Sequence, residues 1–295
     1  MTPSTLIVTG AGGHLGRRVI ELLLEKPSGA RIVATTRSPE KLADLAARGV
    51  EVRAADFDRP EMLAAAFAGG DRLLLISTDV VGQADRRLNQ HRNAVAAAQA
   101  AGVKHVVYTS LVRPEPGTPI TLAPDHHGTE QALAASTLDW TVLRNNVYTE
   151  SLLGALPRAV ASGQLVAAAA DGRAAYVTRE DCARVAAAAL ASTNTGRSTL
   201  DITGPAAVSQ AEIAAIAGEL TGKPVAYVPV PAEGLAAGLA QAGLPGFVVD
   251  LVVSFDVAIA QGYLDGVSTS VADLTGAPAQ SVREFLMENR AALGA

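Results

Sequence analysis

The stretch Thr5–Gly16, "TLIVTGAGGHLG", decides the fold class of this chain. A short apolar run leads into three glycines spaced G-x-x-G-x-x-G, and "HLGRRVIELLLEK" (14–26) then repeats its apolar residues at helical spacing. A strand, a tight glycine turn and a helix in this order are typical of a dinucleotide-binding unit, in which the helix N-terminus faces a pyrophosphate.

The rest of the first half alternates strand-like and helix-like segments. Further strands are predicted at 31–37, 50–56, 71–78, 104–110 and 139–145, with helices between them at 38–49, 60–69, 88–102 and 125–136. The strands are continuous apolar runs, which indicates burial on both faces of a sheet. Repeated β-α-β units of this length predict an α/β fold with a doubly wound parallel sheet of the Rossmann type.

Past about residue 150 the pattern changes. Helices are predicted at 151–162, 180–192, 209–221, 232–243 and 281–293, and short strands at 164–168, 175–178, 198–203 and 225–229. We therefore expect an NAD(P)-binding Rossmann domain over 1–150 and a smaller, mostly helical α+β substrate-binding region over 151–295. The second region is expected to be interleaved with the first and to cover the carboxyl ends of its strands as a lid.

Composition narrows the class of protein. Apolar residues make up 49% of the chain and charged residues 18%, and the net charge is −5, so no basic face for nucleic acid is expected. Cys182 is the single cysteine, which excludes an internal disulfide, fits a reducing compartment and predicts a small buried side chain within a helix. No export signal is recognised and no apolar run reaches the roughly 18–20 residues of a membrane span. A cytoplasmic protein without a metal site is expected.

The glycines of the loop have separate predicted tasks. Gly10, Gly13 and Gly16 occupy the positions that need a positive φ, close approach of the backbone to the ligand, and close contact between helix and strand. A tight turn without a ligand is the alternative. The remaining predicted cofactor contacts of this loop are Ala11, Gly12, His14 and Leu15.

The end of the second strand indicates which nicotinamide cofactor is bound. Proteins that select NAD usually carry an acid about 20 residues beyond the glycines, where it binds the ribose 2′-OH. This chain reads Thr35-Thr36-Arg37-Ser38 there, without an acid. The planar guanidinium of Arg37 suits a 2′-phosphate, with Lys41 as a second cation; a solvated strand-end arginine is the alternative. NADP(H) is therefore predicted in preference to NAD(H).

Further cofactor contacts are predicted after the next two strands. Asp56 ends the third strand, where it can meet the adenine edge or open a turn, and Phe57 follows it. Ser77, Thr78 and Asp79 follow the fourth strand, where the middle of the cofactor must pass.

Several ordered blocks carry a resemblance to a known family. These blocks are "LIVTGAGGHLG", "LLLIST", "QHRNAVAAAQAAGVKHVVYTSL", "HHGTEQAL" and "WTVLRNNVYTE" (140–150). Together they resemble the NmrA-like, atypical short-chain dehydrogenases, and within them the bacterial group of type 2 NAD(P)H:quinone oxidoreductases and triphenylmethane-dye reductases. The similarity runs from the first strand to about residue 190 and continues more loosely to the C-terminus.

The resemblance draws attention to the place of a catalytic pair. Ordinary short-chain dehydrogenases use a Ser after the fifth strand and a Tyr-x-x-x-Lys pair on the next helix, where the cation lowers the pKa of the phenol. This chain has Ser110 in "YTSL", but the i, i+4 positions hold His126 and Glu130. His126 either donates a proton to a substrate oxygen or only stands at a helix start. Glu130 either orients His126 or is a solvated helix residue.

The missing pair predicts a particular kind of hydride acceptor. Reduction of an isolated ketone creates an alkoxide, which needs a positioned acid. Reduction of a quinone creates a phenolate-like oxygen with a pKa of about 10, as for tyrosine, so water can protonate it. The sequence therefore predicts an enzyme, an NAD(P)H-dependent oxidoreductase that transfers hydride from NADPH to a quinone or a similar conjugated acceptor.

The resemblance also implies contacts after the sixth strand. Asn145 is expected to bind the carboxamide or the backbone near the nicotinamide. Tyr148 is expected to stack on an aromatic substrate or to hydrogen-bond to it, so that His126, Tyr148 and Ser110 form the candidate catalytic set. Turn formation and ordinary packing are the alternatives for Asn145 and Tyr148.

A regulator from the same family is the main competing function. Such a protein would bind NADP(H) without turnover and control a protein partner, and the loss of Tyr and Lys suits it equally. An epimerase or isoflavone-type reductase would have a Tyr or Lys base that is not found here. The expected partner is a small aromatic or quinone-like substrate, with a homodimer left open.

Overall fold

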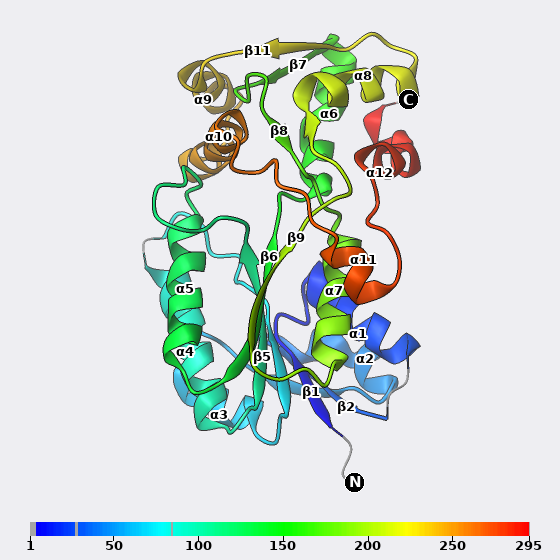
Figure 1. The fold of residues 1–295 in the computed structure, drawn as a ribbon. Helices are drawn as coiled ribbons and strands as arrows, with labels where there is room; N and C mark the ends of the chain where they lie inside the picture. Colours follow the sequence, from blue (N-terminus) through cyan, green and yellow to red (C-terminus); the bar gives the residue numbers. More distant parts are fainter. Residues whose placement is uncertain (1–3, 27–28, 84, 295) are drawn as a thin grey trace. The chain divides into compact units, whose positions relative to one another are not determined.

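A computed structural model describes residues 4–26, 29–83 and 85–294 of the chain, and over these residues its largest sheet has seven strands (Figure 1). The spatial order of the strands is β3 (Glu51–Ala54), β2 (Arg31–Thr36), β1 (Thr5–Val8), β4 (Arg72–Leu75), β5 (His105–Leu111), β6 (Asp139–Asn145) and β9 (Arg197–Ile202). The pairs β2–β3, β1–β2, β1–β4 and β4–β5 are parallel.

The strand order identifies the place where a ligand would bind. The chain builds the sheet outward from β1 to β3, then returns to the other side of β1 to place β4, β5 and β6. In doubly wound sheets the crevice at this reversal, outside the carboxyl ends of the strands, is the ligand site. The predicted α/β Rossmann-type fold is confirmed.

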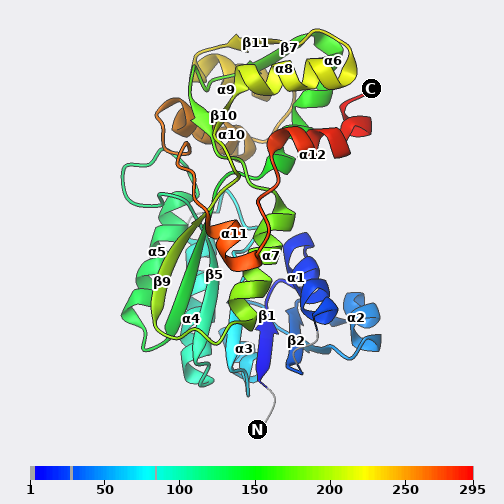
Figure 2. The same cartoon turned by 45° about the vertical axis from the view of Figure 1, so that its right-hand side comes forward.

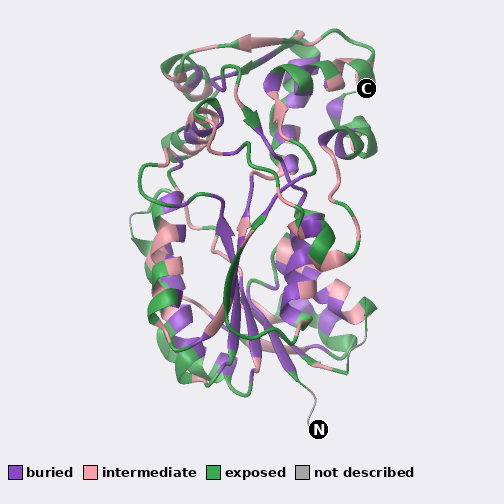
Figure 3. Cartoon of the chain, in the orientation of Figure 1, coloured by how far each residue is buried: buried purple, intermediate pink, exposed green. Residues whose placement is uncertain are grey.

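Helices cover both faces of this sheet. Figures 1 and 2 show α1 (His14–Glu25), α2 (Ala43–Ala47) and α7 (Arg179–Ala191) on one face; α3 (Pro60–Phe67), α4 (Arg86–Ala100) and α5 (Ala123–Ala135) lie on the other. The central strands are buried, as Figure 3 shows, which explains their continuous apolar sequences. Cys182 is buried within α7, as predicted.

The chain divides into two compact units. The first comprises residues 1–110, 125–144 and 182–200, of which residues 1–3, 27–28 and 84 lie outside the described part; it contains most of the large sheet. Its core gathers side chains such as Ile7, Phe67, Leu75 and Tyr108. The second comprises residues 111–124, 145–181 and 201–295, the last residue again lying outside the described part. The prediction that the later region forms a lid stays a prediction.

The second unit is mostly helical. Its described helices are α6 (Leu156–Ser162), α8 (Gln210–Thr221), α9 (Ala232–Gln241), α10 (Gly246–Ala260), α11 (Ser270–Thr275) and α12 (Val282–Glu288). Short 3₁₀ segments occupy Thr149–Gly154 and Arg290–Leu293, and a further one in the first unit, Pro39–Leu42, precedes α2. The second unit also contains two small sheets. In one, β7 (Gln164–Ala167) runs parallel to β11 (Ala226–Pro229), and in the other, β8 (Arg173–Ala174) pairs antiparallel with β10 (Val208–Ser209).

Some elements differ from the sequence-based prediction. The segment predicted as a strand at 198–203 lies in the large sheet as β9, next to β6. The prediction of a strand at 175–178 is wrong, because the strand in this region, β8, ends at Ala174. Helices α10 and α11 were not predicted. In α10 the valine-rich sequence favours a strand, but packing against α9 accompanies its helical conformation.

Candidate functional site

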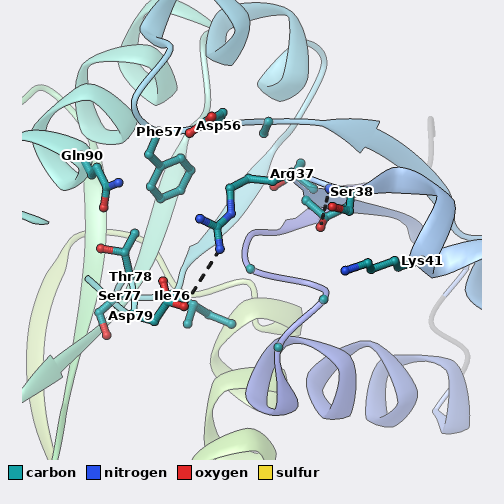
Figure 4. A pocket seen from close by; sticks show the side chains of 16 residues that line it. Arg37, Ser38, Lys41, Asp56, Phe57, Ile76, Ser77, Thr78, Asp79 and Gln90 are labelled. Carbon is teal, nitrogen blue, oxygen red and sulfur yellow. Dashed lines mark hydrogen bonds and ion pairs between the residues drawn. The ribbon is translucent and has the colours of Figure 1, made fainter. Parts of the chain in front are cut away.

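A pocket of about 380 Å³ opens at the reversal point of the large sheet, within the first unit (Figure 4). The segments that follow β1, β2, β3 and β4 line it, and Gln90 of α4 completes the lining. These are the carboxyl ends of parallel strands, so the chain brings together four segments that are far apart in sequence.

The glycine loop after β1 has the backbone that the motif predicts. Gly10 has φ +60°, in the region that side chains strain. A Cβ on Gly16 would lie 2.5 Å from the carbonyl oxygen of Gly10, so only glycine lets α1 approach the strand end this closely. Gly12 and Gly13 are exposed in the pocket wall, where backbone rather than side chain faces the space.

The N-terminus of α1 fits a bound pyrophosphate. Gly13 is its N-cap and makes no side-chain hydrogen bond, so no side chain caps the first N–H groups of the helix. His14 and Leu15 are the first two helical residues. Uncapped N–H groups and the positive end of the helix dipole together form a site for a phosphate group. This is the group that a dinucleotide would place here.

A cationic corner lies after β2. Arg37 and Lys41 both line the pocket (Figure 4). The Arg37 side chain is 66% exposed. Its Nη2 atom lies 4.0 Å from Oδ2 of Asp79, which is 84% exposed. An exposed pair at this distance holds the guanidinium only weakly, so Arg37 is available to an anionic group in the pocket.

The segment after β3 combines the two alternatives that the sequence left for Asp56. Its Oδ1 accepts a hydrogen bond from the Asp58 N–H at 3.0 Å, so it does open a turn. Asp56 and Phe57 also line the pocket, on the side opposite Lys41 in Figure 4. Asp56 therefore both opens a turn and lines the pocket.

The predicted contacts after β4 also meet in the pocket. Ser77, Thr78 and Asp79 line it, together with Ile76. Sequence reasoning missed several lining residues that only their position next to predicted ones could have indicated: Thr35, Thr36, Ser38, Ala55 and Ile76. It also missed Gln90, for which the sequence gave no signal, because Gln90 lies on a helix and reaches the pocket only through tertiary packing. Its amide nitrogen donates to Asp58 at 2.9 Å.

Other predicted cofactor residues lie beside the pocket or away from its wall. Ala11 and Gly16 are buried behind the loop, and His14 and Leu15 begin α1. Asn145 belongs to the second unit, and its contact with the cofactor stays a prediction. Its amide nitrogen donates to the Tyr148 hydroxyl at 3.3 Å, while its Oδ1 is buried without a hydrogen-bond partner in the described structure.

His126 is held inside the protein by two neighbours. The guanidinium of Arg87 donates to its Nε2 at 3.1 Å, and its Nδ1 lies 2.9 Å from the Tyr108 hydroxyl. Burial, reinforced by the charge of Arg87, holds the pKa of His126 well below 6.5. Because Nε2 accepts, the single ring proton lies on Nδ1 and is donated to Tyr108. This geometry favours a structural part for His126 rather than proton donation to a substrate.

Glu130 follows neither of the two roles that the sequence suggested. It forms a two-pronged ion pair with Arg144, with Nη2–Oε2 and Nε–Oε1 distances of 2.6 and 3.0 Å. The Ser110 hydroxyl donates to Oε1 at 2.6 Å. Both charged side chains are largely buried, so Glu130 is neither solvated nor bonded to His126. The proton of Ser110 is committed to this carboxylate.

Tyr148 lies in the second unit, at the start of a 3₁₀ segment. The guanidinium carbon of Arg179 lies 5.4 Å from the centre of its ring, a distance that suits a cation–π contact. The role predicted for Tyr148 towards a substrate stays a prediction.

No described helix has both the length and the apolar character needed to cross a lipid bilayer. Within the described ranges, no group of three or more His, Cys, Asp or Glu side chains is placed to hold a metal ion.

The strand order, the glycine turn and the pocket define a dinucleotide-binding protein of the Rossmann class. Comparisons with known proteins narrow this class. The model of the NAD(P)H-binding family matches residues 10–193. Quinone oxidoreductase 2 of Escherichia coli K12 is 38% identical over 279 residues, which cover 95% of this chain and 96% of the relative.

Two solved structures are similar over almost their whole length. The NADPH-dependent quinone oxidoreductase of E. coli in complex with NADPH gives a TM-score of 0.91 at 37% identity, covering 96% of this chain and 99% of that one. The triphenylmethane reductase of Citrobacter sp. complexed with NADP(H) gives 0.90 at 35% identity, covering 97% and 99%.

The chain therefore belongs to the NAD(P)H-binding, NmrA-like family of atypical short-chain dehydrogenases. The predictions of this family and of an NAD(P)H-dependent oxidoreductase are confirmed.

Proposed function

We propose that this protein uses NADPH to reduce a quinone or another conjugated acceptor, without a tuned acid from the protein. The relatives named above act on quinones and triphenylmethane dyes by their names, and they are similar over nearly the whole chain. When bound, NADPH would supply a hydride to the acceptor. The chain's own residues would hold and orient the cofactor.

One observation carries the proposal. The two helix positions where ordinary short-chain dehydrogenases have Tyr and Lys hold His126 and Glu130, and both are engaged by neighbouring side chains. His126 is neutral and gives its only ring proton to Tyr108, while Glu130 is a carboxylate paired with Arg144. An acceptor that becomes a phenolate, with a pKa of about 10, can take its proton from water and needs neither group.

The preference for NADPH rests on the cationic corner of the pocket. Arg37 is weakly held, exposed and without a neighbouring acid on β2, and Lys41 stands one turn further along the chain. A guanidinium can bind a 2′-phosphate by charge-assisted hydrogen bonds. Such bonds contribute about 1.5–3 kcal/mol each, so losing one would weaken binding of NADPH by about 10- to 100-fold.

Turnover with matched acceptors tests the proposed reaction. Oxidation of NADPH, followed at 340 nm, is expected with menadione and benzoquinone but not with cyclohexanone or acetone. A ketone reduced as fast as the quinones would contradict the absence of a protein acid. Tight binding of NADPH without turnover of any acceptor would instead favour the regulatory function.

Arg37→Ala tests the cofactor preference. This variant should raise the Kd for NADPH by about 10- to 100-fold and leave the Kd for NADH nearly unchanged, because only NADPH carries the 2′-phosphate. Arg48→Ala is the matched control, since Arg48 is exposed at the end of α2 and does not line the pocket. Equal losses for both cofactors in Arg37→Ala would defeat the assignment.

A further inference from the structure

The pocket wall after β4 is held by side chains rather than by sheet hydrogen bonds. The backbone N–H groups of the three residues that follow β4 each donate a hydrogen bond to a side chain from another part of the chain. The pairs are Ile76 N to Thr9 Oγ1, Ser77 N to Thr109 Oγ1 and Thr78 N to His91 Nε2, each at 2.9 Å. The last is the only one of the three that uses a titratable group.

The hydrogen bonds of His91 fix its tautomer. A backbone N–H can only donate, so Nε2 of His91 carries no proton where it meets Thr78. The ring proton therefore lies on Nδ1, which donates to Oγ1 of Thr129 at 2.9 Å. Thr129 in turn donates to the backbone carbonyl of Asp125 at 2.7 Å, one turn earlier in α5. The donor and the acceptor of each hydrogen bond in this path are therefore defined.

The surroundings keep His91 neutral. Its side chain has no solvent exposure, and it lies on α4 with Tyr108 of β5 at one side, at a ring distance of 5.8 Å. Burial, helped by the positive charge of Arg87, lowers the pKa of His91 to about 3. A protonated ring would lose its acceptor for Thr78, so neutrality and the hydrogen bond to the pocket wall depend on the same burial.

A second pair of hydrogen bonds lies beside this path. Arg87 donates to His126 and His126 donates to Tyr108, whose ring lies edge-on to that of His91. Residues from α4, β5 and α5 thus form one buried polar cluster around His91, and His91 joins this cluster to the Thr78 N–H at the pocket. Side chains held on several sides in this way have few alternative arrangements, which keeps the acceptor of the Thr78 N–H in place.

We propose that His91 is a positioning residue for the cofactor: its neutral imidazole fixes the Thr78 backbone, and with it the stretch of pocket wall that the middle of the dinucleotide must pass. His91 touches neither cofactor nor substrate in this role. The inference rests on the proposed function only for the identity of the cofactor. Its hold on Thr78 belongs to the protein without cofactor and can be measured there.

The test compares His91→Ala with two matched variants. His91→Gln keeps an acceptor and a donor side by side, as the imidazole has, and should preserve the hold on Thr78. His105→Ala removes another buried histidine of the same unit, which bonds to Thr141 at 2.9 Å at the amino end of β5 and does not line the pocket. The readouts are the Kd for NADPH from fluorescence titration, amide hydrogen exchange over residues 76–79 without cofactor, and the Tm.

The expected pattern separates positioning from stability. His91→Ala should raise the Kd for NADPH by about 10-fold and speed exchange at Thr78 by about 10-fold or more, because the part-buried Thr78 N–H loses its acceptor. His91→Gln should recover most of both losses. His105→Ala should lower the Tm while its Kd stays within about twofold of the wild type.

Other results would overturn the inference. An unchanged Kd and unchanged exchange in His91→Ala would do so, as would an equal rise in Kd in His105→Ala. If His91→Ala does not fold, a His91→Gln variant that folds and binds NADPH like the wild type supports the inference, and one that folds but binds 10-fold more weakly refutes it. A wild-type protein that fails to bind NADPH would overturn the proposed cofactor, and the exchange rate at Thr78 would still decide the hold of His91.

Discussion

Replacing Gly16 by alanine should lower both the stability of the protein and its affinity for NADPH. The added Cβ would lie 2.5 Å from the carbonyl oxygen of Gly10, 2.8 Å from its carbonyl carbon and 3.0 Å from Cα of Ala11. All three are backbone atoms of the glycine turn, so no flexible side chain can give way. The first turn of α1 and the loop must therefore move apart.

The magnitude follows from these distances. Ordinary contact begins near 3.4 Å, so the closest pair must separate by about 0.9 Å. Such overpacking costs about 1–3 kcal/mol, while alanine gains at most about 1 kcal/mol over glycine in a helix. The free energy of unfolding should fall by about 1–2 kcal/mol. The donor–acceptor distances of N–H···O hydrogen bonds vary over a range of only about 0.5 Å. A shift of this size should therefore weaken the contacts between the helix N-terminus and a phosphate, and raise the Kd for NADPH by about 10-fold or more.

Gly238→Ala is the matched control. Gly238 also lies in a helix, α9, but among the described residues no neighbouring atom lies within 4 Å of the place that an added Cβ would take. The same substitution should there raise the free energy of unfolding by about 0.5–1 kcal/mol and leave the Kd unchanged. Urea unfolding and fluorescence titration with NADPH measure both quantities. A Gly16→Ala variant that is as stable as Gly238→Ala, or that binds NADPH like the wild type, would refute the reasoning.

Two further predictions concern buried polar groups of the first unit. Arg72 of β4 donates to the carbonyls of Ala189, Leu190 and Asn194 at the end of α7, at 3.1, 3.0 and 2.8 Å. Arg72→Met should therefore lower the free energy of unfolding by about 2–4 kcal/mol in urea, because the carbonyls lose their donors, and an unchanged midpoint would contradict this. Acid should also destabilise the fold through His105, whose pKa burial lowers from 6.5 to about 4. Because the unfolded chain binds this proton more readily, the stabilising contribution of neutral His105 is fully present above pH 6.5 and is lost as the pH falls towards 4. The free energy of unfolding should therefore fall by about 2 kcal/mol between pH 7 and 5. His105→Gln should remove this part of the pH dependence of the unfolding free energy, and an identical slope in the variant would show that His105 titrates normally.

The parts of the site that were predictable are those set by local backbone. Gly10 and Gly16 could be assigned tasks because a positive φ and a close helix–strand contact depend on a few consecutive residues. Arg37 could be placed in the pocket because every parallel strand delivers its next residue to the same sheet edge. The alternation of strands and helices indicated the class of fold for the same reason.

The parts that were not predictable depend on distant neighbours. His126 stands at a predicted helix start, and nothing near it in sequence indicates burial against Tyr108 and Arg87, which are 18 and 39 residues away. Gln90 reaches the pocket from the second turn of α4, through tertiary packing. The helix α10 was missed because valines taken alone favour a strand, and the local sequence does not show that this segment packs against α9.

The buried pairs also explain why the missing Tyr and Lys are more than two isolated substitutions. A lysine in place of Glu130 would face the guanidinium of Arg144 without a carboxylate between them, and Ser110 would lose its acceptor. A tyrosine in place of His126 would remove both ring nitrogens, the one that accepts from Arg87 and the one bonded to Tyr108. Both side chains are therefore coupled to buried partners, so that changing either one disturbs hydrogen bonds of its neighbours. In this chain the two helix positions, 126 and 130, are therefore used for internal hydrogen bonds and not for proton transfer. A suitable reaction is one in which the hydride acceptor stabilises its own negative charge.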